Sequence, residues 1–140
     1  EMGRCKTIVK KLKIEDGLLL TDIQLSFRSN SLYLHRVLVD TGSGGTIVST
    51  DLAESIGIIA EEDDMIYRIT GVGGSEVVFA KKVDSIKIAD AEIRDFIVEV
   101  GAMNYGFDLE GIIGLDFLQK IKAIINLDKL TIEFEGHDGS

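Results

Sequence analysis

The group best placed to do chemistry in this chain is a carboxylate at the end of an apolar run, in "LVDTGSGGTIVS", residues 38–49. A buried carboxylate is costly unless it is hydrogen-bonded, paired or protonated. Glycines after Asp40 allow a tight turn whose N–H groups point at the acid, and the hydroxyls of Thr41 and Ser43 add donors. The segment therefore predicts an acid held at a strand end, either as a simple Asx turn or as a catalytic group.

Composition limits the elements that can surround this acid. The 140 residues are 45% hydrophobic and 28% charged, which predicts one globular domain over residues 1–140. The net charge of −9 disfavours nucleic acid as a partner, and no apolar run is long enough to cross a membrane. Cys5 is the only cysteine, so we expect no disulfide framework and a reducing, cytoplasmic location.

Metal chemistry has little support in the sequence. His35 and His137 are the only histidines, and neither belongs to a cluster with ligand spacing. The acidic run at residues 61–64 lacks the alternating ligands and the turn glycine of a calcium loop, so it is interpreted as a solvated loop. We expect no metal and no organic cofactor.

Most of the chain alternates apolar and polar residues with a period of two, which predicts short strands. These strands cover residues 8–14, 18–27, 32–39, 77–88, 93–100 and 124–134. Turn residues separate them at 15–17, 29–31, 89–91 and 127–129, spacings typical of antiparallel hairpins. The pattern predicts an all-β domain of antiparallel strands.

Two short helices interrupt the strand pattern. Ser49 and Thr50 can cap "DLAESIG", which Gly57 ends, and Asp116 opens "DFLQKI" with its carboxylate near the positive end of the helix dipole. Each helix follows an apolar run and a glycine turn, and the two turns lie about half the chain length apart. Duplication of one hairpin-plus-helix unit would explain this weak repeat. Only the first unit carries Asp-Thr-Gly.

Three motifs in order make the sequence similar to a known family. "VLVDTGSGGTIVS", the glycine-rich "ITGVGGS" and "GIIGLDFL" together resemble the aspartic proteases with a retropepsin-like fold, over roughly residues 15–135. The motif "IIGLDFL" is more similar to cellular and bacterial members than to retroviral enzymes, which typically have an arginine where this chain has Leu115. The resemblance implies a retropepsin-like acid-protease fold with a flap hairpin and one or two short helices.

The family's mechanism implies a partner, because it needs two carboxylates that flank one water and share a proton. This chain has one Asp-Thr-Gly, and Asp116 is placed in the first turn of a helix, where a cap or a surface pair is the simpler role. The resemblance therefore implies a homodimer with Asp40 of each copy at the two-fold axis. Thr41 would hydrogen-bond across the axis, and Gly42 would let the two turns approach.

The chain ends have two possible roles under this resemblance. Residues 6–14 and 130–134 could interleave with those of a second copy in a small sheet, or they could be edges covered within one protomer.

Ser43 carries a separate expectation about pH. A hydroxyl that donates to an ionised carboxylate favours the charged form, so Ser43 beside Asp40 predicts an activity optimum on the acidic side of neutral.

The flap and the substrate complete the prediction. Residues 65–80 form a candidate hairpin, with Gly71, Val72, Gly73 and Gly74 at its tip as substrate-binding residues together with Ser43. Tyr67 could pack on this flap. An extended peptide that adds as a strand is the expected ligand.

Apolar side chains that could form its subsites are also core candidates, namely Val39, Ile47, Val72 and Ile112. The sequence predicts an aspartic endopeptidase with Asp40, Thr41 and Gly42 as catalytic residues. The alternative is a catalytically inactive dimerisation or peptide-binding module with the same fold.

Overall fold

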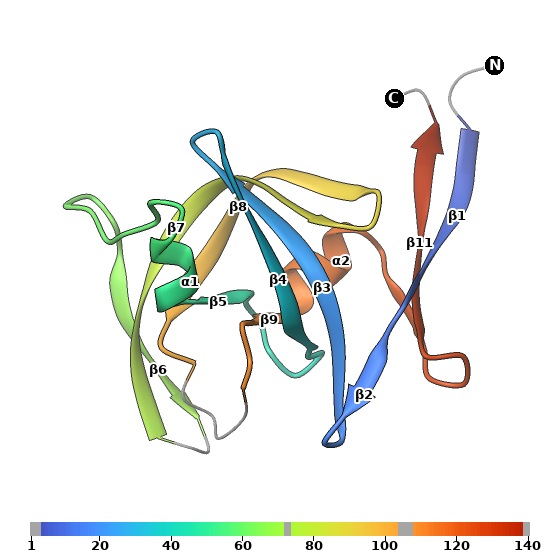
Figure 1. The fold of residues 1–140 in the computed structure, drawn as a ribbon, viewed down its shortest axis with the longest axis horizontal. Helices are drawn as coiled ribbons and strands as arrows, with labels where there is room; N and C mark the ends of the chain where they lie inside the picture. The colour runs from blue at the N-terminus through green and yellow to red at the C-terminus, as the bar shows by residue number, and fades with distance from the viewer. Residues whose placement is uncertain (1–3, 72–73, 104–107, 139–140) are drawn as a thin grey trace.

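The computed structural model describes residues 4–71, 74–103 and 108–138. Within these residues the chain folds into two β-sheets and two short helices (Figure 1). The strands are β1 (Arg4–Lys11), β2 (Lys13–Glu15), β3 (Leu18–Phe27), β4 (Asn30–Val39), β5 (Ile47–Ser49), β6 (Ile66–Gly71), β7 (Gly74–Ile88), β8 (Ala91–Gly101), β9 (Gly111–Ile113), β10 (Ile124–Asn126) and β11 (Thr131–Asp138). The helices are α1 (Thr50–Glu54) and α2 (Leu115–Lys120).

The larger sheet nearly encloses the core. Its strand order is β2-β3-β4-β9-β5-β8-β7-β6, and β3 also pairs with β7, which closes six of the strands into a ring. The smaller sheet has the order β1-β11-β10 and extends away from the ring (Figure 1). The predicted mostly β fold with two short helices is confirmed. Two pairings, β4 with β9 and β5 with β8, are parallel, which hairpin spacing does not reveal.

The predicted strand at residues 8–14 is two strands in different sheets. β1 pairs with β11 in the small sheet, whereas β2 pairs with β3 in the large one. Between them Leu12 is buried, and its N–H donates to the Leu130 carbonyl over 2.8 Å. Burial of this side chain at the crossing point fixes where the chain changes sheets.

The turn predicted at residues 29–31 lies one residue earlier. Arg28 and Ser29 form it with φ of 47° and 71°, and β4 already begins at Asn30. Two consecutive left-handed residues match the twist of the flanking strands, so the hairpin closes with a two-residue loop. Because the turn is tighter than predicted, β4 begins two residues before the predicted strand and runs to Val39, directly before Asp40.

The main core lies inside the closed sheet and against α2. Phe117 of α2 is fully buried and packs edge-on against Phe96, with 5.8 Å between ring centroids. Val39 also belongs to this core, which is the second of the two roles that the sequence left open for it. A second, smaller cluster on another face consists of Leu20, Ile47, Met103, Leu109 and Ile112. Ile47 and Ile112, the other apolar candidates in the described chain, lie there.

Both helices are single turns that connect strands. α1 ends at Glu54 with Ser55 at its C-cap, earlier than the predicted end at Gly57, which closes the following turn with a φ of 87°. Ser49 occupies the N-cap position, but its side chain makes no capping hydrogen bond, which corrects the predicted cap. α2 begins at Leu115, one residue before the predicted start. Neither helix in the described ranges has the length and apolarity needed to span a bilayer.

Candidate active site

Asp40 stands where β4 leaves the sheet beside β9. Val39 is the register partner of Ile113 in the parallel β4–β9 pair, and the Asp40 N–H donates to the Ile113 carbonyl over 2.9 Å. This bond holds the aspartate backbone to the second apolar motif of the sequence. The side chain is half-buried, so its carboxylate is anchored at its base and can reach the surface.

The turn after Asp40 is built around this carboxylate. The Gly42 N–H donates to Asp40 Oδ1 over 2.8 Å, and the Ser43 N–H donates to the Asp40 main-chain carbonyl over 3.1 Å. The sequence predicted several backbone N–H groups at the carboxylate, but among the described residues only that of Gly42 donates to it, since the Ser43 N–H bonds to the main chain. A charge-assisted bond of this kind orients the acid.

Ser43 does not have the role that the sequence suggested. Its Oγ donates to the Gly45 carbonyl over 2.8 Å, and a hydroxyl has only one proton to donate. The hydroxyl is thus used to close its own turn and does not donate to Asp40. Gly45 is only two positions further along the chain, so the turn brings its carbonyl within reach of the hydroxyl. The argument for an acidic optimum from Ser43 is therefore wrong.

Thr46 and Asp116 join the two motifs. The Thr46 hydroxyl donates to Asp116 Oδ1 over 2.8 Å and accepts from the Gly114 N–H over 3.2 Å. Asp116 also accepts from the N–H groups of Thr46 and Phe117, at 3.3 and 2.8 Å. Its two oxygens are therefore engaged in holding α2 to the Asp40 turn. The surface ion pair that the sequence offered for Asp116 is therefore replaced by hydrogen bonds to Thr46 and Phe117.

Gly114 is required for this contact. A Cβ at this position would overlap the carbonyls of Gly45 and Ser43, which are backbone atoms and cannot move aside. The same close approach lets the Leu115 N–H donate to the Ser43 carbonyl over 2.8 Å. Glycine thus permits the two turns to lie in direct contact.

Thr41 and Gly42 are exposed at the outer side of the turn. Thr41 borders a hollow of about 460 Å³ that α2 and the start of β10 form. The other residues that line it are Leu115, Leu118, Gln119, Lys122, Ala123 and Ile125. Directly beside the aspartate, the surface is therefore concave and largely apolar.

The predicted flap is a β-hairpin in the described residues. β6 pairs with β7 from Ile66 opposite Phe79 to Gly71 opposite Gly74. Gly71 and Gly74 thus face each other at its end. The remaining two predicted tip residues, Val72 and Gly73, lie outside the described residues.

The sequence that contains this turn matches a known family. The profile of the family described as "Aspartyl protease" matches residues 26–117, which include the Asp40 turn, the hairpin and the second motif. The chain belongs to the retropepsin-like aspartyl protease family. As the sequence predicted, its similarity extends to cellular and bacterial proteins.

Two curated relatives of this aspartyl protease domain come from fungi. The chain is 29% identical to DNA damage-inducible protein 1 of Neurospora crassa over 104 residues, and 27% identical to UBA domain-containing protein Mud1 of Schizosaccharomyces pombe over 106 residues. Each alignment covers 74% of this chain but only 23% and 30%, respectively, of the relative. The chain thus corresponds to a minor part of these longer proteins.

Solved structures show the same fold. A retropepsin-like aspartic protease from Rickettsia conorii superposes with a TM-score of 0.64 at 14% identity, and the match covers 98% of this chain and 96% of that one. EIAV protease complexed with the inhibitor HBY-793 gives a TM-score of 0.59 at 22% identity, over 82% and 98% of the two chains. At these identities the likeness concerns the fold alone.

One contact near the aspartyl protease turn had no clear sequence signal. The Tyr67 hydroxyl of β6 donates to Glu99 Oε2 of β8, and the Glu99 carboxylate lies against Gly45. Burial and the neighbouring carboxylate raise the pKa of Tyr67 above its usual range, which keeps the phenol protonated as a donor. Glu99 therefore links the flap strand to the turn that carries Asp40.

A second unpredicted cluster fixes the base of the flap. Lys81 of β7 is buried, and its Nζ pairs with Glu61 at 2.7 Å and Asp64 at 2.5 Å. Arg28 also pairs with Glu61, at 3.1 Å. Bonding to Lys81 lowers the pKa of both carboxyl groups. The acidic loop predicted to be solvated is thus tied to the strand beneath it.

Metal ligands do not gather in the part of the chain that the structure describes. Histidine, cysteine, aspartate and glutamate form no group of three or more there with the geometry to hold an ion.

Proposed function

We propose that this domain is an aspartic endopeptidase that acts as a homodimer, with the Asp40 carboxylates of two copies around one water. The observation that carries the proposal is the difference between the two aspartates of the two motifs. Asp40 accepts one backbone bond and reaches the surface, whereas Asp116 is fully engaged by Thr46 and Phe117. One chain therefore offers one acid at this site, and the second comes from another copy.

The surface around Asp40 supports such a pairing. Thr41 is exposed beside the hollow of about 460 Å³, and Leu115 at its edge is 37% exposed. Further out, Ile124 and Leu127 expose 63% and 67% of their surface. Burial of such apolar surface drives association of two copies, and a two-fold axis at the hollow brings the two turns together.

The terminal sheet offers a further contact. β1 and β11 pair with each other inside one chain, so these strands cover each other's edge within one protomer. The order β1-β11-β10 leaves the outer edges of β1 and β10 without a partner strand in the described chain. A second copy can pair at these edges.

The chemistry follows from two carboxylates at close range. Because like charges repel, the pair shares one proton: one carboxylate takes a proton from the water while the other, protonated, polarises the peptide carbonyl. The water oxygen attacks the carbonyl carbon, and the proton passes to the leaving nitrogen as the C–N bond breaks. Gly42 orients each acid through its N–H bond. The flap hairpin covers an extended peptide bound as a strand.

Cleavage of a denatured protein and of a peptide library between about pH 3 and 7 tests this proposal. Wild type should cleave, pepstatin-type inhibitors should block it, and Asp40→Asn should be inactive. Asp90→Asn serves as the matched control and should cleave like wild type, because it makes the same change at an exposed aspartate in the turn between β7 and β8. Equal residual cleavage by wild type and Asp40→Asn would leave an inactive peptide-binding or dimerisation module, and not an enzyme.

Mixing the two proteins tests the shared site. When wild type exchanges subunits with an equal amount of Asp40→Asn, mixed dimers hold one acid, so activity should fall to about half of that of wild type alone. Sedimentation should find a dimer under the assay conditions. Unchanged activity after complete exchange, or an active monomer, would contradict a site built from two chains.

A further inference from the structure

The Glu99 side chain occupies the place that a side chain at position 45 would take. A Cβ on Gly45 would overlap the Glu99 carboxylate, so the acid lies directly on the backbone of the turn that follows Asp40. Glu99 itself comes from β8, and Tyr67 on the flap strand donates to its other oxygen. A carboxylate from β8 thus contacts both the turn that follows Asp40 and the flap strand.

The neighbours of Glu99 in the sheet form an apolar row. Register pairs place Ile112 beside Ile47, Ile47 beside Glu99, and Glu99 beside Ala80. Paired residues on adjacent strands point to the same face of a sheet. Ile47 and Ile112 belong to the second cluster, which lies on another face than the main core that holds Val39. The Glu99 carboxylate therefore lies on the same face of the sheet as the apolar side chains of Ile47 and Ile112.

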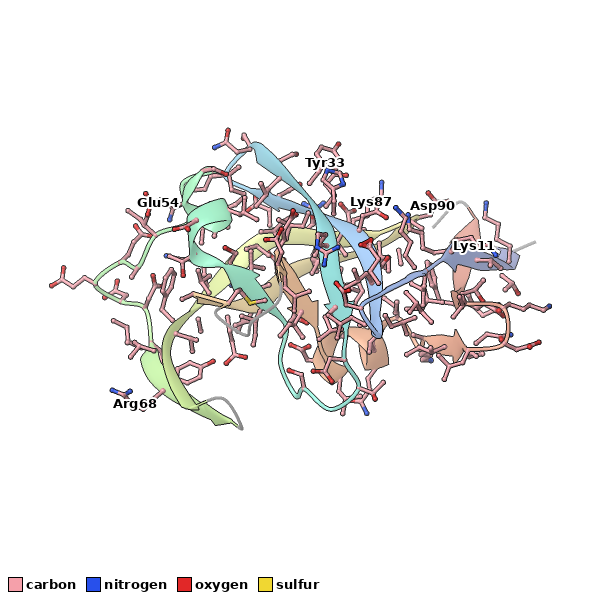
Figure 2. All side chains as sticks on the ribbon, turned by 60° about the horizontal axis from the view of Figure 1, so that its bottom comes forward. Lys11, Tyr33, Glu54, Arg68, Lys87 and Asp90 are labelled. Carbon is pink, nitrogen blue, oxygen red and sulfur yellow. The ribbon has the colours of Figure 1, made fainter. Side chains whose placement is uncertain are left out.

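The flap lies over the same face. Tyr67 pairs with Val78, which is buried, whereas the next residue, Arg68, projects outward from the flap strand (Figure 2). Because side chains alternate along a strand, the two residues face opposite sides. Tyr67 thus faces inward to Glu99, and a peptide between flap and turn passes this carboxylate.

Glu99 has no basic partner within the described residues. The carboxylates in the ion pairs of this part of the chain are Glu15, Asp22, Glu61, Asp64 and Glu92. A half-buried carboxylate that accepts from one phenol has further acceptor capacity. An arriving ammonium or guanidinium group would supply the missing counter-charge.

We propose that Glu99 is a specificity-determining residue that selects peptides with a lysine or arginine side chain. This inference rests on the proposed function, since the peptide is the substrate of that site. The Glu99 carboxylate takes the cation, and the buried side chains of Ile47 and Ile112 beside it hold this face of the sheet in place. The net charge of −9 also attracts cationic peptides to the domain.

Paired peptides test the assignment. Each pair carries one lysine or one glutamine at the same position, scanned across the residues on both sides of the scissile bond. At one position wild type should prefer lysine by about tenfold in kcat/KM, and Glu99→Gln should abolish the preference by lowering kcat/KM about tenfold more for the lysine peptide than for the glutamine peptide. Higher salt should reduce the wild-type preference.

Two further variants separate charge from structure. Glu54→Gln removes the same charge from the exposed face of α1, far from the flap in Figure 2, and should keep the lysine preference. Tyr67→Phe removes the phenol donor but keeps the Glu99 charge, and should keep the preference as well. If Glu99→Gln weakens both members of each pair equally, Glu99 only supports the flap and the assignment is wrong.

Binding distinguishes this inference from the proposed function. The paired peptides are titrated by fluorescence anisotropy into Asp40→Asn, with and without Glu99→Gln. Preferential binding of lysine peptides that Glu99→Gln removes, from a protein whose wild type cleaves nothing, would retain Glu99 as a selectivity residue and overturn the protease proposal. Cleavage with no lysine preference at any position would do the reverse.

Discussion

Thr46 and Asp116 are 70 positions apart in sequence, and the hydroxyl of one donates to the carboxylate of the other over 2.8 Å. This single bond closes the contact between the turn that carries Asp40 and the helix that follows the second motif. Because Thr46 is also the acceptor for the Gly114 N–H, loss of its hydroxyl disturbs both sides of the contact.

Replacement of Thr46 by valine should destabilise the domain by about 1–3 kcal/mol, because Asp116 loses a donor and the Gly114 N–H loses its acceptor in a buried place. Urea unfolding at fixed protein concentration measures this. Thr7→Val is the matched control, since its hydroxyl bonds to Glu135 on the exposed terminal sheet, and should change stability by less than about 0.5 kcal/mol. Equal effects of the two variants would contradict the role given to Thr46.

Gly114→Ala should destabilise the domain by about 1–3 kcal/mol and reduce cleavage strongly, because the added methyl overlaps the carbonyls of Gly45 and Ser43 and pushes the Asp40 turn outward. Gly44→Ala provides the comparison for folding, since nothing lies within 4 Å of a Cβ at that position. Thermal unfolding of both variants decides the point. A Gly114→Ala protein as stable as Gly44→Ala would show that the two turns are not in tight contact.

Ser43→Ala should leave the pH dependence of cleavage unchanged and cost about 1 kcal/mol of stability, because the hydroxyl bonds to the Gly45 carbonyl and not to Asp40. The test is a profile of kcat/KM against pH for variant and wild type. A shift of the acidic limb in the variant would return Ser43 to the role that the sequence suggested.

The Lys81 cluster should make stability depend on pH. The carboxyl groups of Glu61 and Asp64 have pKa values lowered from their ordinary 4.5 and 3.8, so their contribution is present above those values and is lost as pH falls through the lower folded values. The Lys81 pKa is raised, so its contribution is lost only at strongly alkaline pH. Wild type should therefore lose stability on acidification below about pH 4.5.

Lys81→Met should be less stable than wild type at neutral pH and should lose less on acidification, because its acidic loop no longer pairs with a buried cation. Lys82→Met is the control, since the neighbouring side chain points to the exposed side of the same strand. Chemical unfolding between about pH 3 and 7 compares them. The interpretation is wrong if the two variants follow the same pH curve.

The sequence predicted what local pattern can specify. Alternation located the long strands, and the two short helices were predicted within a few residues of their observed bounds. Short strands such as β5 and β9 were not predicted, because three residues carry too little periodicity and their pairing partners are distant. The same holds for Leu12, where a buried leucine in an otherwise alternating run is the only sign that the chain changes sheets.

The candidate site divides in the same way. Asp40 and its glycine turn are contiguous, so the bond from Gly42 could be anticipated from residue types alone. Thr46 with Asp116, and Glu99 with Gly45, meet only through the pairing of β9 and β8 with β5, which no local pattern specifies. Lys81 did offer a signal, because it stands two residues before the buried Val83 on the same face of β7.

The pairing of β1 with β11 determines how the domain responds to a pull on its two ends. Arg4 and Asp138 are register partners at one end of the ladder, so force applied to both ends opens its hydrogen bonds one after another, as a zipper, instead of shearing them together. The small sheet should peel away at low force up to Leu12, where the chain enters the closed ring. Until the opening reaches Leu12, a force on the two chain ends should not act on the turn that carries Asp40.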